Sequence, residues 1–239
     1  MSAQATISNP REFRTLLSGE ATTLADWAGH FDWRRIGSHV TVIAVGAGLY
    51  GAAMGWWRDP WQALFVAIKF PLILLLTALG NALLNAMLAP LLGLNLTLRQ
   101  SLSAVLMSFA IASAVLGAFS PLMAFVVWNA PPLTPDVKST FTYVFIKLTH
   151  VVVIAFAGII GNARLFQLLT QLGGSRAVAR RVLLAWLAAN LFFGSQLAWI
   201  CRPFIGSPNL PVTFLREGAF QSNFFEDVFH TTTWLFDWD

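Results

Sequence analysis

Five long apolar stretches constrain the fold more than any other feature of this sequence. They lie at about residues 37–57, within 61–93, and at about 98–128, 142–161 and 182–200. A helix needs about 20 apolar residues to cross a hydrocarbon core of about 30 Å. Hydrophobic residues make up 56% of the chain and charged residues only 11%, which excludes an ordinary soluble domain. We therefore predict an all-α fold, a polytopic integral membrane helical bundle of about five transmembrane helices.

The second stretch, residues 61–93, is longer than one untilted crossing requires, and it contains Lys69 and Pro71. Proline is tolerated best in the first turn of a helix or at a kink, because it has no amide proton and clashes with the preceding turn. Two arrangements stay open on this pattern. The stretch forms one tilted span, or it divides into two shorter segments.

Basic and aromatic residues predict the orientation of the bundle. With the N-terminus inside, the inner segments hold most of the basic residues, and the outer segments hold Arg58, Lys138, Arg202 and Arg216. Cytoplasmic segments of membrane proteins carry such an excess of Lys and Arg. Tryptophans gather at the predicted outer ends of the spans, where an indole buries its ring and keeps its N–H hydrated. We predict N-terminus in and C-terminus out, in a multi-pass protein of the bacterial inner membrane.

On this scheme the chain has three parts. Residues 1–35 form a cytoplasmic amphipathic N-terminal segment, residues 36–201 form the five-helix transmembrane domain, and residues 202–239 form an extracytoplasmic C-terminal tail. Both ends have apolar residues at helical spacing, so both offer contact surfaces beside the membrane.

The tail is predicted to contain a short amphipathic helix. Phe225, Val228 and Phe229 share one face of it, and Glu226 and Asp227 make its polar side acidic. Anionic lipids repel an acidic face, so we expect this helix to pack on protein rather than bind free membrane. Whether that protein is the bundle itself stays open.

Lys147 and His150 lie three residues apart within the fourth stretch, which holds no acid to pair them. A lysine can snorkel to the interface, and a histidine can stay neutral and hydrogen-bonded, so both are tolerable as structural residues. Lys69 and Arg202 lie at a comparable depth on the predicted outer side. In a second hypothesis the four residues form an outer-leaflet cluster that binds a lipid phosphate or the protein's own acidic tail.

Three asparagines fall inside the spans. Asn81 and Asn85 share one face of the second stretch near mid-membrane, and Asn190 lies near the middle of the fifth. Amides in hydrocarbon seek partners, and interhelical hydrogen bonds there contribute about 0.6 to 2 kcal/mol each. These residues are candidate interhelical polar contacts or, in the alternative, the lining of a polar translocation path.

Ala47, Gly51 and Gly55 form a ridge of small residues along the first stretch. Such a ridge lets two helices approach closely, within one chain or between chains. It is therefore a candidate helix-packing ridge.

No pattern in the sequence is typical of a catalytic, cofactor or metal site. The spans contain no acidic residue, the four histidines are scattered, and the single cysteine excludes an internal disulfide. We expect no catalytic residue, no cofactor and no metal, and hence a protein that is not an enzyme. The basic residues lie beside apolar spans rather than on one soluble face, which argues against nucleic acid as a partner.

The stretch ALFVAIKFPLILLLTALGNALLNAMLAPLLGLNLTLRQSLSAVLMSF, a span, a short loop and a Ser-rich span, resembles the Yip-domain membrane protein family. The five spans, the polar N-terminal segment, the short loops and the outward C-terminus are also similar to that family. The resemblance implies an integral membrane scaffold or trafficking-type adaptor without catalytic residues, and it supplies no site residues.

Two functions are compatible with these patterns. The first is a non-enzymatic scaffold, adaptor or accessory subunit for membrane lipids, including anionic ones, or for other membrane proteins, self-association included. Its inner contact surface would be the N-terminal segment and a basic loop at residues 161–181. The alternative is a transporter or channel component, with the span asparagines, Lys147 and His150 along a polar path.

Overall fold

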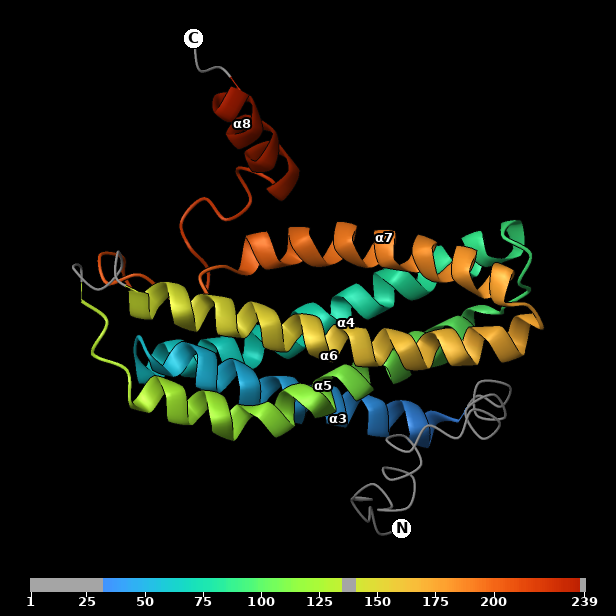
Figure 1. The fold of residues 1–239 in the computed structure, drawn as a ribbon, viewed down its shortest axis with the longest axis horizontal. Helices are drawn as coiled ribbons and strands as arrows, with labels where there is room; N and C mark the ends of the chain where they lie inside the picture. Colours follow the sequence, from blue (N-terminus) through green and yellow to red (C-terminus); the bar gives the residue numbers. More distant parts are fainter. Residues whose placement is uncertain (1–31, 135–140, 237–239) are drawn as a thin grey trace, which may run out of the picture.

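The computed structural model of the chain describes residues 32–134 and 141–236, and every regular element in that part is a helix (Figure 1). The long helices are α3 (Trp33–Trp56), α4 (Pro60–Leu91), α5 (Leu98–Trp128), α6 (Phe141–Gly173) and α7 (Arg176–Cys201), followed by the short α8 (Phe224–Phe236). Five of them are long and apolar enough to cross a membrane. The predicted all-α bundle of about five spans is confirmed. Most of the predicted N-terminal segment, residues 1–31, lies outside the described residues.

The second apolar stretch forms one helix, so only the first of the two open arrangements is realised. α4 runs through Pro71 and Pro90 without a break. The Asp59 carboxylate accepts a hydrogen bond from the Trp61 amide at 2.8 Å and caps its start. At about 1.5 Å per residue, the 32 residues of α4 are longer than a hydrocarbon core of about 30 Å. The helix therefore crosses at a tilt or extends beyond the core.

The predicted basic loop at residues 161–181 is wrong, because most of it is helical. α6 continues far beyond its apolar stretch, and only a short turn separates it from α7. Leu165, Leu168 and Leu169 extend the helical period past the predicted end, and all three are almost fully buried. Gly174 has a φ of +60°, a conformation that favours glycine, and makes the turn.

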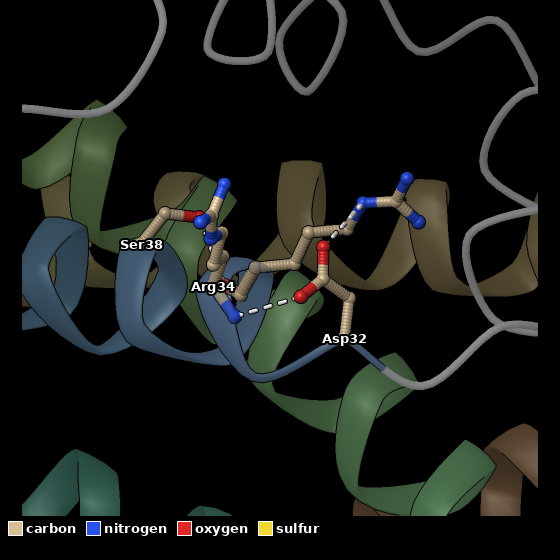
Figure 2. A network of polar contacts seen from close by, with 4 residues as sticks. Asp32, Arg34 and Ser38 are labelled. Atoms are coloured by element: carbon tan, nitrogen blue, oxygen red, sulfur yellow. Dashed lines mark hydrogen bonds and ion pairs between the residues drawn. The ribbon is translucent and has the colours of Figure 1, made fainter. Parts of the chain in front are cut away.

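The start of α3 is fixed by local polar contacts (Figure 2). The Asp32 carboxylate accepts a hydrogen bond from the Arg34 amide at 2.9 Å and lies 3.9 Å from the Arg35 Nε atom. The Ser38 hydroxyl donates to the Arg35 carbonyl at 2.8 Å. Because the first amides of a helix have no partner within it, the hydrogen bond from the Arg34 amide to Asp32 stabilises this end of α3, which the sequence predicts to lie inside.

By their contacts, the five spanning helices form a closed ring in which each helix touches the next. α3 contacts α4 and α5, α5 contacts α6, α6 contacts α7, and α7 contacts α4. α4 and α5 also contact each other across the ring. α7 is the least buried of the five, which leaves one of its sides free for the C-terminal part of the chain.

The ridge of small residues packs against α4 of the same chain. A Cβ added to Gly51 would lie 2.6 Å from the Val66 carbonyl oxygen, and one added to Gly55 would lie 2.6 Å from the Gln62 carbonyl oxygen. Ala47 is fully buried. Because backbone atoms occupy the space of a side chain at both glycines, the ridge serves packing within one bundle.

Candidate functional site

One end of the bundle is covered by an irregular segment, residues 202–223, which we call the tail loop; we call this end the loop end. It is the end at which α7 finishes and α4 begins, and the sequence predicts it to lie outside. The buried Gln62 side chain of α4 donates from Nε2 to the carbonyls of Pro203 at 2.8 Å and Phe204 at 3.0 Å. Arg58 donates to two further tail-loop carbonyls, each at 3.4 Å. The tail loop is therefore tied to the start of α4.

Aromatic side chains of the tail loop extend this contact along α4. Phe65 and Phe214 meet edge to face with ring centroids 5.6 Å apart, and Phe70 meets Phe204 at 6.5 Å. Such aromatic pairs contribute about 0.5 to 1.5 kcal/mol beyond the area they bury. Hydrogen bonds and apolar packing thus act together to hold the tail loop on the bundle.

Lys69 is fully buried beneath the tail loop. Its Nζ atom has no hydrogen-bond partner among the described residues and lies 5.2 Å from the centroid of the Phe214 ring. The Cys201 side chain is close enough to interact electrostatically with Lys69. An aromatic face attracts a cation without accepting a conventional hydrogen bond, so the Phe214 ring offsets part of the cost of burying a charge at Lys69.

Two arginines lie against one indole at the end of α7. The guanidinium carbon of Arg202 lies 3.0 Å from the Trp199 ring centroid, and that of Arg216 lies 5.4 Å from it. The Trp199 Nε1 atom donates to the Ser222 carbonyl at 3.1 Å, which anchors the tail loop beside both arginines. Burial and then the charge of Arg216 lower the pKa of Arg202, while Asp227 acts in the opposite direction.

The predicted four-residue basic cluster is only partly assembled. Lys69 and Arg202 both lie at the loop end, each against an aromatic ring. His150 is buried and turned to α3, where its Nδ1 atom shares a hydrogen bond of 2.9 Å with the Tyr50 hydroxyl. Lys147 is exposed on α6. Its exposure agrees with a snorkelling lysine, and the His150 contact agrees with a hydrogen-bonded histidine.

The three span asparagines come together between α4 and α7. Asn85 Nδ2 donates to Asn81 Oδ1 at 2.9 Å, and Asn81 Nδ2 donates to Asn190 Oδ1. The Asn85 Oδ1 atom, at the start of this relay, is buried without a partner among the described residues. The relay joins two helices and leaves little of its polar surface available to a passing solute.

A cavity of 370 Å³ lies beside this relay. α4 supplies Phe70, Ile73 and Thr77 to its wall, and α7 supplies Asn190 and Gly194. The wall is mainly apolar, with Thr77 and Asn190 as polar exceptions. The Thr77 hydroxyl is buried without a partner among the described residues.

Sequence reasoning missed Tyr50, Gln62, Phe214 and Arg216. Gln62 carried a usable signal, since it is a polar residue at the start of an apolar stretch. Arg216 and Phe214 lie in a segment without periodicity, so no pattern placed them against α4 and α7. Tyr50 looked like one more apolar residue of the first span.

Within the described residues, no group of three or more His, Cys, Asp or Glu side chains could hold a metal ion. The fold is that of a multi-pass integral membrane protein, and at its loop end Lys69 and Arg202 lie against aromatic rings. No protein-family model, no curated protein and no solved structure matches the chain.

Proposed function

We propose that the chain is a non-enzymatic scaffold, adaptor or accessory subunit that holds another membrane protein beside its bundle, in the bacterial inner membrane. The observation that carries this proposal is the position of α8. Figure 1 shows α8 standing away from the bundle, with one end near α7. The Yip-domain resemblance, which implies a scaffold or adaptor, stays part of the proposal.

Among the described side chains of α8, those of its first turn pack on α7. The Phe225 ring stacks on Phe192 with centroids 5.3 Å apart, and the Phe224 amide donates to Gln196 Oε1 at 2.9 Å. The next turn carries Val228, 46% exposed, and Phe229, 65% exposed. The bundle therefore leaves this apolar face uncovered, although the sequence predicted that the helix packs on protein.

The chemistry of α8 indicates what covers it. Glu226 and Asp227 are exposed beside the apolar face. An anionic lipid surface would repel these carboxylates, whereas a protein with an apolar patch and neighbouring basic side chains would fit both features. The proposed occupant is such a membrane protein.

The alternative, a transporter or channel component, has less support. It requires the span polar groups to converge on one water-accessible path. The asparagines instead pair with one another between α4 and α7, His150 pairs with Tyr50, and Lys147 is exposed. Only Asn190 of this group lines the mainly apolar cavity.

A photocrosslinking amino acid at Phe229 tests the proposal in native membranes. The matched control carries the probe at Leu148, which is 56% exposed on α6. We expect the Phe229 probe to yield a discrete protein adduct and the Leu148 probe to yield lipid adducts. A Phe229 probe that labels only lipid would refute the proposal. An adduct with the mass of two copies would identify self-association and refute a partner of another sequence.

A further inference from the structure

We propose that Arg202 and Arg216, held against Trp199 at the end of α7, form a binding site for a phosphate group. The inference goes beyond the scaffold proposal and does not rest on it, because it uses none of the exposed face of α8. It assigns a role to Arg216, which the sequence did not single out, and leaves Lys147 and His150 out of the site.

The two guanidinium groups share one aromatic partner. Both lie against the Trp199 indole ring, and after burial the charge of Arg216 is the next cause that lowers the pKa of Arg202. Two like charges repel, and an anion that contacts both offsets that repulsion. Asp227 supplies a partial counter-charge to Arg202 but forms no ion pair with it.

Arg216 has donors that the described protein leaves unused. Its Nε and Nη2 atoms are buried and without a hydrogen-bond partner among the described residues. Leaving a buried charged donor unsatisfied costs more than leaving a neutral one, so such atoms are normally paired. Nε and Nη2 form one edge of the guanidinium fork, and that edge suits the two oxygens of one phosphate.

The position of the pair indicates why the anion is a phosphate. α3 ends at Trp56, α5 ends at Trp128, and Trp199 lies two residues before the end of α7, so the loop end carries an interfacial belt of indoles. Such belts lie at the level of lipid headgroups. A guanidinium pair at this level can be reached by lipid phosphates from the membrane and by dissolved phosphate from the water.

Binding of phosphatidylglycerol and of inorganic phosphate to the full-length, delipidated protein tests the site. Native mass spectrometry reports the lipid, and the thermal unfolding midpoint reports inorganic phosphate. The test variant is R202Q/R216Q. The matched control is R176Q/R180Q, which removes the same charge from two exposed arginines at the opposite end of α7. R216Q alone carries the test if the double variant does not fold.

We expect R202Q/R216Q to bind one phosphatidylglycerol about tenfold or more weakly than the wild type, and R176Q/R180Q to bind it equally well. That result supports the site with a lipid as its ligand. If inorganic phosphate raises the unfolding midpoint of the wild type and the control but not of R202Q/R216Q, and lipid binding is unchanged, the site takes dissolved phosphate. Equal affinities in all three proteins for both probes, or an equal loss in the control, would overturn the proposal.

Discussion

Replacing Gly51 by alanine tests how closely α3 and α4 approach. The added Cβ would lie 2.6 Å from the Val66 carbonyl oxygen and 3.2 Å from the Phe70 Cβ, whereas ordinary contacts begin near 3.4 Å. The obstacle at Val66 is backbone, so the helices themselves must separate. Overpacking of this kind costs about 1 to 3 kcal/mol.

Gly158 on α6 is the matched control, because nothing lies within 4 Å of the Cβ that alanine would add there. Both substitutions gain the same intrinsic helix propensity, about 1 kcal/mol, so the difference between them isolates the helix crossing. We expect Gly51→Ala to have a free energy of unfolding about 1 to 3 kcal/mol below that of Gly158→Ala, measured by denaturation in mixed micelles. Equal unfolding curves would refute the close crossing of α3 and α4.

Three further substitutions address the polar groups. Asn81→Leu removes two hydrogen bonds of the asparagine relay, and the free energy of unfolding in micelles should fall by about 1 to 4 kcal/mol; an unchanged value contradicts the relay. Lys69→Met replaces a buried amino group that has no hydrogen-bond partner among the described residues, so the thermal unfolding midpoint should rise, and a fall would reveal a favourable interaction of Lys69. Gln62→Leu frees two tail-loop carbonyls, so limited proteolysis should cut residues 202–223 faster; rates equal to those of wild type would show that the tail loop is held by other contacts.

The spans could be predicted from the sequence, because the length of an apolar stretch and its lack of charge decide whether a helix can cross a membrane. The sequence was insufficient for the end of α6. Arg164 and the polar residues after it suggested a loop, but Leu165 and Leu169 already showed the spacing of a buried helical face. An apolar window finds the membrane-embedded part of a helix and misses an amphipathic extension beyond it.

The candidate site was predictable only where helical spacing applies. Asn81 and Asn85 are four residues apart, so their shared face followed from the sequence, and the similar depth of Asn190 suggested a partner. Lys147 and His150 are three residues apart, yet one is exposed and the other buried. The boundary between the lipid-facing and buried sides of α6 passes between them, and spacing alone cannot place that boundary.

The spans contain no acidic residue, and at the loop end aromatic rings contact the cationic side chains instead. Lys69 lies against Phe214, and Arg202 and Arg216 lie against Trp199, so every one of these cations rests on an aromatic face. An aromatic face offsets part of the desolvation of a cation but leaves its net charge in place. A carboxylate at the same position would have cancelled that charge. The aromatic contacts therefore leave the charges of Arg202 and Arg216 in place for a phosphate, with Asp227 as a partial counter-charge to Arg202.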